Sequence, residues 1–210
     1  MPLDQILIAF VVLIASLSVH EAAHAWAADR LGDATARMLG RLSLNPVVHV
    51  DPIGTILFPL ISMVSGTALL IGWAKPVPVN VHALGRDWRR KFMLIAAAGP
   101  ISNLCMATAC AVALRLLIPS EAALTTAGST VSALLYQMVT MNILLAVFNM
   151  IPIPPLDGGN VLAGLLTGPA ANAFDRLRPY GFLILYVLLF TGTLFAIIAP
   201  AEIFLQQWLL

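Results

Sequence analysis

Residues 14–26 read Ile-Ala-Ser-Leu-Ser-Val-His-Glu-Ala-Ala-His-Ala-Trp, and this stretch decides how the rest of the chain is interpreted. It belongs to an apolar run long enough for a membrane-spanning helix, yet it contains three ionisable side chains, His20, Glu21 and His24. Residues four apart on a helix are offset by about 40°, so the two histidines share one face and can bind one Zn²⁺ together. Glu21 lies about 100° round the helix from His20, within reach of a metal held there. Because ionisable groups inside a span are costly and usually functional, the stretch predicts a metal site on a membrane-spanning helix.

The composition of the whole chain agrees with a membrane setting. Of its 210 residues, 60% are hydrophobic and 10% are charged, and the mean hydropathy is +0.94. A soluble domain carries about 25% charged residues. A nucleic-acid binder carries a basic surface, whereas this chain has a net charge of only +1. These values argue against a disordered chain, a nucleic-acid partner and an ordinary cytosolic enzyme, and we predict a polytopic membrane protein with one domain, 1–210.

Five apolar stretches approach the length of about 20 residues that a helix needs to cross a bilayer. They are 3–24, 53–73, 93–117, 131–151 and 180–199. The two longer connections, 25–52 and 74–92, hold most of the charge, and each contains a strand-like piece, at 41–44 and 75–80. We therefore expect helices within the membrane and short membrane-associated strands beside them.

The distribution of basic residues predicts which stretches cross completely. If 53–73 enters the membrane and returns on the same side, ten of the eleven Lys and Arg residues share one side, leaving Arg115. A full crossing would divide the two charged connections three against five. The positive-inside rule favours the first arrangement and makes the basic side cytoplasmic. The expected fold class is an all-α polytopic protein of the cell membrane, with four full transmembrane helices, one re-entrant segment, and the connection 118–130 with Glu121 on the opposite side.

A catalytic zinc needs a third protein ligand and one open position. Asp157 is the favoured candidate, because it lies in an apolar run after the span 131–151 with no charged neighbour in sequence. Prolines before it end the helix, and Gly158 and Gly159 after it allow a tight turn. In the re-entrant topology the spans 3–24 and 131–151 both end on the cytoplasmic side, so Asp157 meets the two histidines at similar depth. The other candidates lie in the two charged connections: His49, Asp51, His82 and Asp87.

These residues resemble a known family. His20-Glu21-Ala22-Ala23-His24 in the first span, and Asn149 followed eight residues later by the aspartate of Leu156-Asp157-Gly158, look like the metal motifs of the site-2 protease family of intramembrane zinc metalloproteases. The stretch 98–103, Ala-Gly-Pro-Ile-Ser-Asn, is similar to a Gly-Pro-Asn element of that family. The stretches 45–54 and 72–80 look like its compact prokaryotic branch without a PDZ domain.

The resemblance implies a zinc metalloendopeptidase that hydrolyses a peptide bond in or near a transmembrane segment of a membrane-protein substrate. It implies one Zn²⁺ per chain on His20, His24 and Asp157, with Glu21 as general base and Asn149 stabilising the oxyanion. An amide donor near a metal suits that last role, although an asparagine in a span also commonly makes an interhelical hydrogen bond. The site is expected nearer the cytoplasmic side. An unwound substrate could pair there with an exposed strand edge, offered by the strand-like parts of 25–52 and 74–92 or by the proline-rich stretch before Asp157.

Two further polar residues are candidates for an auxiliary role, Asn103 and His49, each with a structural role as the alternative. Asn142 is interpreted as structural. Two other functions stay open: a catalytically inactive homologue that binds membrane helices as a chaperone or regulator, and a metal or proton transporter. The presence of Glu21 beside all three expected ligands favours the enzyme, and the chain shows none of the internal repeats usual in transporters.

Overall fold

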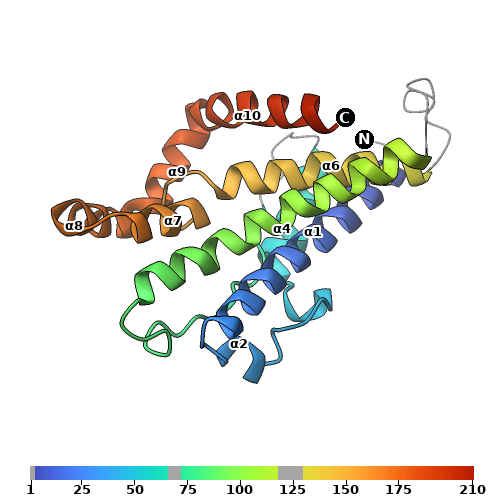
Figure 1. Ribbon diagram of the computed structural model, residues 1–210. Helices are drawn as coiled ribbons and strands as arrows, with labels where there is room; N and C mark the ends of the chain where they lie inside the picture. The colour runs from blue at the N-terminus through green and yellow to red at the C-terminus, as the bar shows by residue number, and fades with distance from the viewer. Residues whose placement is uncertain (1–2, 66–71, 118–129) are drawn as a thin grey trace.

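The computed structural model describes residues 3–65, 72–117 and 130–210 (Figure 1). The prediction of an all-helical fold is confirmed for these ranges, but the predicted strands are not, because no strand occurs in them. The strand-like pieces 41–44 and 75–80 are irregular instead. Two prolines in the second piece, Pro76 and Pro78, lack the N–H groups that a strand needs on one edge to join a ladder.

Three long helices form the centre of the molecule, α1 (Leu3–Arg30), α4 (Trp88–Leu117) and α6 (Thr130–Asn149). Each is long and apolar enough to cross a membrane. Small residues of α4, Ala107 and Ala111, pack against Val139 and Ile143 of α6, and small side chains let helix backbones approach closely. Helices able to cross a membrane therefore occur at the predicted spans 3–24, 93–117 and 131–151, with α1 extending to Arg30, α4 beginning at Trp88 and α6 ending at Asn149.

The stretch 180–199, predicted as one full span, is divided between two helices. Two residues separate α9 (Gly181–Phe190) from α10 (Thr193–Leu209), and the helical stretch Gly168–Phe190, which ends with α9, is bent by 80° against α10. The break lies at Gly192, whose φ of +74° suits glycine and not a residue with a side chain. The described residues thus contain three helices able to cross a membrane, or four if the bent pair counts as one.

The segment predicted to turn back has its two ends side by side. It begins as a π-helical turn, η2 (Pro52–Leu57), continues as α3 (Phe58–Ser65), and is described again from Gly72. The Trp73 N–H donates to the Gly54 carbonyl at 3.1 Å, and the Thr55 hydroxyl donates to the Trp73 carbonyl at 2.7 Å. This closure agrees with a re-entrant course, although 66–71 lie outside the described residues, as do 118–129 with Glu121.

Short helices complete the fold and place the remaining connections. They are α2 (Thr35–Met38), η1 (Pro46–Val48), α7 (Asp157–Leu165), α8 (Gly168–Leu177) and η3 (Arg178–Tyr180). Helix α7 packs extensively on α4. This contact returns the chain from the end of α6 towards the middle of the three-helix centre, where α1 carries its histidines.

Candidate metal centre

Three of the predicted site residues meet at one point. His20 and His24 stack one turn apart on α1, with their Nε2 atoms 3.0 Å apart. Asp157 is the first residue of α7, and its Oδ2 lies 3.1 Å from the Nε2 of His20 and 3.3 Å from the Nε2 of His24. The two histidines are buried and the aspartate is half-buried.

The spacing of these donor atoms suits zinc. Bonds of about 2.0–2.1 Å in tetrahedral geometry place neighbouring ligand atoms about 3.3 Å apart. The three separations here, 3.0, 3.1 and 3.3 Å, are close to that value. Two imidazole nitrogens and one carboxylate oxygen are also a common catalytic zinc set, which leaves one coordination position for water or substrate. The residues present therefore fit the metal that the sequence predicts.

A backbone carbonyl determines the orientation of the His24 ring. The Nδ1 of His24 donates to the carbonyl of Ile95 on α4 at 2.7 Å. A neutral imidazole that donates from Nδ1 carries its lone pair on Nε2. His24 therefore presents its lone pair towards His20 and Asp157, which is the form that binds a metal.

A chain of buried side-chain amides determines the orientation of the His20 ring. Its Nδ1 donates to the Asn103 Oδ1 at 2.5 Å, and the Asn103 Nδ2 donates to the Asn142 Oδ1 at 2.7 Å. The Asn142 Nδ2 donates in turn to the Ser16 hydroxyl oxygen at 2.9 Å and to the Met138 carbonyl. Asn103, Asn142 and Ser16 are fully buried. The chain links α1, α4 and α6 behind the candidate ligand.

These contacts extend what the sequence predicts about the two asparagines. Asn103, a candidate for an auxiliary role, contacts His20 directly. Asn142, interpreted as structural, is one hydrogen bond further from the same ring. Ser16 was not singled out from the sequence, and the signal for all three was the same: a polar side chain inside an apolar stretch must find a partner when buried.

Gly99 lets the backbone of α4 lie directly against both histidine rings. A Cβ atom at this position would lie 2.4 Å from the His24 Nε2 and 2.6 Å from the His20 Nε2. Any side chain here would therefore displace the candidate ligand atoms or occupy the place of the metal. The close approach to the histidine rings therefore explains why a glycine is needed at the position of Gly99.

Two glycines explain how Asp157 reaches α1. A Cβ at Gly158 would lie 2.3 Å from the Met150 carbonyl oxygen, and one at Gly159 would lie 2.7 Å from the Pro154 nitrogen. The first turn of α7 therefore packs directly on the turn that follows α6. This close packing folds the chain back on itself and aims the Asp157 carboxylate at the histidines.

A cavity of about 350 Å³ opens beside the three candidate ligands. Glu21 lines it, and its Oε2 accepts the Val77 N–H at 3.1 Å. Asn149 lines it as well, with its Nδ2 donating to the Leu145 carbonyl of its own helix at 2.9 Å. Asn160, one turn after Asp157, is a further polar residue of the wall that the sequence did not point out. The predicted catalytic and metal-binding residues thus share one cavity.

His49 lies elsewhere. It is buried, and its Nε2 donates to the Ser43 carbonyl at 2.7 Å, while its own carbonyl accepts the Lys75 N–H. It is not among the residues that line the cavity. The structure therefore places this candidate auxiliary residue within the packing of the two charged connections, and not at the candidate ligands.

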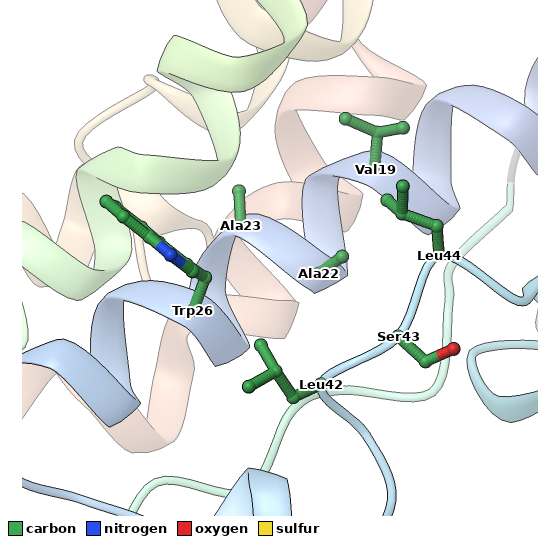
Figure 2. A pocket seen from close by; sticks show the side chains of 7 residues that line it. All are labelled: Val19, Ala22, Ala23, Trp26, Leu42, Ser43 and Leu44. Carbon is green, nitrogen blue, oxygen red and sulfur yellow. The ribbon is translucent and has the colours of Figure 1, made fainter.

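A second, apolar hollow of about 420 Å³ lies on another face of α1 (Figure 2). It lies between that helix and the irregular segment Leu42–Leu44, and Figure 2 shows the lining side chains of both. Its lining residues are Val19, Ala22, Ala23, Trp26, Leu42, Ser43 and Leu44. We call this hollow the α1 groove.

Comparison with known proteins gives one family. A model of peptidase family M50 matches residues 116–192, which include Asn149 and Asp157. The Bacillus subtilis protein named "Putative zinc metalloprotease YwhC" is 36% identical over 191 residues, covering 90% of this chain and 83% of that protein. The Rip2 proteins of Mycolicibacterium smegmatis and Mycobacterium tuberculosis, described by the same words, are 31% and 32% identical over 88% of this chain and 69% of theirs. No solved structure matches the chain.

Proposed function

This chain belongs to peptidase family M50, the site-2 protease family, and we propose that it is an intramembrane zinc metalloprotease. It would hydrolyse a peptide bond in or near a transmembrane segment of a membrane-protein substrate. The observation that carries this proposal is the meeting of His20, His24 and Asp157 at zinc spacing, beside Glu21 in one cavity. The names of the relatives, which describe zinc metalloproteases, support it.

The metal would be one Zn²⁺ per chain, held by the Nε2 atoms of His20 and His24 and by the Asp157 carboxylate. Zinc bound there supplies a Lewis acid that activates water and polarises the scissile carbonyl. The protein's own contribution is to keep both imidazoles in the tautomer that binds metal, through Ile95 and Asn103. Mutation of such hydrogen-bond partners of metal ligands typically lowers metal affinity by about 10–100-fold.

Glu21 would move the proton. Its carboxylate lines the cavity beside the candidate ligands, so it can accept a proton from the attacking water and pass it to the leaving amine. Asn149 would stabilise the negative charge on the substrate oxygen. One hydrogen of its Nδ2 is used on Leu145, and the second is free to donate, because an amide nitrogen carries two.

A substrate helix must unwind before its scissile carbonyl is accessible, since helical carbonyls are hydrogen-bonded. Extended substrate could then pair with a free backbone edge of the enzyme. We assign that edge to Leu42–Leu44 in the α1 groove, because the N–H groups of Leu42 and Leu44 have no protein acceptor in the described ranges. The other irregular piece, 75–80, is less suitable, since two of its residues are prolines and most of its N–H groups are used.

We further propose that the protein lies in the cell membrane with this site nearer the cytoplasmic side. Most of its basic residues belong to connections 25–52, 74–92 and 168–179, and the positive-inside rule assigns those connections to the cytoplasm. Labelling of single cysteines placed at Gly85 and Met38 tests the assignment. Both are expected to react from the cytoplasmic side, and reaction from the outside would contradict it.

The experiment that tests the function is a pair of substitutions of Glu21. Single-span test proteins are co-expressed with the enzyme, and those that it cleaves serve as substrates. Glu21→Gln and Glu21→Ala are expected to retain zinc and to lower cleavage by about 100–10,000-fold, the usual contribution of general acid–base catalysis. Glu202→Gln on α10 is the matched control and should cleave normally. Undiminished cleavage by both Glu21 variants would refute the mechanism, because the observed cleavage would not depend on Glu21.

A further inference from the structure

The segment Lys75–Asn80, which we call the strap, forms one wall of the cavity through Pro76, Val77 and Val79. We propose that Arg41 and Asp33 are positioning residues, which hold the strap so that the Val77 N–H keeps the Glu21 carboxylate in place. The role of Glu21 as base rests on the proposed function, whereas the hydrogen bonds of the strap do not. Three charged side chains converge on these six residues, and the contacts of each carry one step of the inference.

Arg41 anchors the first half of the strap. Its side chain is buried, with 7% of the residue exposed, and its guanidinium donates to the Lys75 carbonyl at 2.5 Å, to the Pro76 carbonyl at 3.2 Å and to the Val48 carbonyl. It makes no ion pair with any carboxylate of the described residues. A buried cation without an acidic partner is costly unless its hydrogens are used. Here main-chain carbonyls accept from both terminal nitrogens, while the buried Nε has no acceptor in the described ranges, so the side chain holds backbone and not a carboxylate.

Asp33 anchors the far end. It is fully buried, and its Oδ2 accepts the Asn80 N–H at 2.6 Å. Its Oδ1 accepts the backbone N–H and the hydroxyl of Thr35. Burial by itself would raise the pKa of Asp33, but the hydrogen bonds from Thr35 and Asn80 outweigh it and lower that pKa. The carboxylate therefore stays ionised and holds the strap at neutral pH.

The middle of the strap is held by Glu21. Pro76 and Pro78 have no N–H, so the strap offers only four backbone donors. Lys75 donates to the His49 carbonyl and Val77 to Glu21, while Asn80 donates to Asp33. Val79 is the fourth donor, without an acceptor in the described part of the chain. Three donors thus have three separate acceptors, and the Glu21 carboxylate is one of them.

One peptide group connects Arg41 to Glu21. The Pro76 carbonyl, which accepts from Arg41, and the Val77 N–H, which donates to Glu21, belong to the same planar unit. Movement of the guanidinium therefore moves the donor on Glu21. Hydrogen bonds in series also polarise one another, so the Arg41 charge strengthens the bond to the carboxylate. Glu21 has three rotatable side-chain bonds, and this contact selects one orientation towards the candidate ligands.

Hydrogen exchange of the Val77 amide tests the linkage without any substrate. In the purified, zinc-loaded protein, site-resolved exchange is expected to be about tenfold faster in Glu21→Ala and in Arg41→Met, the value of one lost hydrogen bond. Glu21→Gln is the matched control, because its side-chain oxygen still accepts, and it should exchange like the wild type. Arg41→Lys keeps the positive charge but not the forked guanidinium, so its Val77 exchange rate should lie between those of the wild type and Arg41→Met. Unchanged Val77 exchange in both Arg41 variants, with α4 and α6 still protected, would overturn the proposal.

A double-mutant cycle tests the consequence for the reaction. Val77→Pro removes one N–H in a segment that already has proline on both sides, Pro76 and Pro78. Val77→Ala keeps the N–H and is its control. With a test protein that the wild type cleaves, Val77→Pro and Arg41→Lys should each lower kcat several-fold with KM and zinc content unchanged. Combined, they should lower kcat no further than the more damaging single change, because both act through one peptide group. Losses that multiply would show that Arg41 does not act through Val77. An equal loss in Val77→Ala would show that the reaction depends on the Val77 side chain and not on its N–H, which also contradicts the proposal.

Discussion

The three-helix centre of α1, α4 and α6 and the C-terminal pair of α9 and α10 are both strongly apolar, yet they are built differently. In the centre, Ser16, Asn103 and Asn142 are fully buried and hydrogen-bonded across three helices. The described residues of the C-terminal pair bury no side-chain amide, and their large apolar side chains include some of the most exposed ones, with Phe190 85% exposed. Apolar residues thus have two uses here: a close-packed interior around polar groups, and a surface that suits lipid.

The difference lies in where polar atoms are placed. Without water, a buried amide must find a protein partner, and that partner defines one arrangement of helices. Exposed apolar side chains need no specific protein partner, so many arrangements of the helices that carry them have nearly the same free energy. Substitutions in the centre should therefore have large and specific effects, whereas substitutions on the exposed face of the C-terminal pair should have small ones.

The largest effect is expected from removing a candidate ligand. Asp157→Ala leaves two histidines, and we expect zinc, measured by elemental analysis of the purified protein, to fall from about one per chain to near zero. Asp87→Ala removes an exposed carboxylate that the sequence also offers as a ligand, and it should retain the metal. A full complement of zinc in Asp157→Ala would remove this residue from the site.

Next comes Gly99→Ala. The added methyl group would lie 2.4 Å from the His24 Nε2, so we expect zinc affinity, measured by competition with a chelator, to fall by about 10–100-fold, as for other disturbed metal sites. Gly164→Ala creates a clash of similar closeness, 2.4 Å from the Met93 Cβ, away from the ligands. It should lower stability and leave zinc affinity unchanged. Equal zinc affinity in both variants would contradict the steric role of Gly99.

The amide chain behind His20 should give graded effects. Asn103→Ala removes the direct partner of the ring and should weaken zinc binding by about tenfold or more. Asn142→Ala, one bond further away, should weaken it less, and Asn103→Asp should restore part of the loss because a carboxylate still accepts from the Nδ1. Thr108→Ala on the exposed face of α4 is the control. A larger effect at Asn142 than at Asn103 would reverse the proposed order.

The smallest effect is expected at Phe190. Phe190→Ala should change the free energy of unfolding by less than about 0.5 kcal/mol, as exposed positions usually do. Ile143→Ala, at a fully buried position between α4 and α6, should cost about 2–5 kcal/mol. Unfolding in mixed micelles measures both. A large loss at Phe190 would mean that a protein surface, and not lipid, covers this face.

Much of the candidate site could be predicted because the relevant patterns are short. His20 and His24 are one helical turn apart, so the helix alone brings them together. Asp157 is 137 residues from His20, but it was the carboxylate with the fewest charged neighbours in an apolar context. The break at Gly192 could not be predicted from the same kind of evidence, because apolar residues continue on both sides of it. Strands were also expected at 41–44 and 75–80, and neither forms. In 75–80, two prolines lack N–H groups and side-chain carboxylates accept two of the remaining ones, so few donors are left for a neighbouring strand.

The sequence by itself determined the class of the protein, the helix that carries the two histidines, and the residues able to bind a metal, because these follow from composition and from spacing within one turn. Arg41 shows what it left undecided. In the sequence it is one of ten basic residues on the predicted cytoplasmic side, whereas in the structure it is buried and fastens the strap beside Glu21. Only the tertiary structure decides which carbonyls surround a cation. Those carbonyls belong to segments that are distant in sequence and are brought together by packing, so no local pattern of residues can predict them.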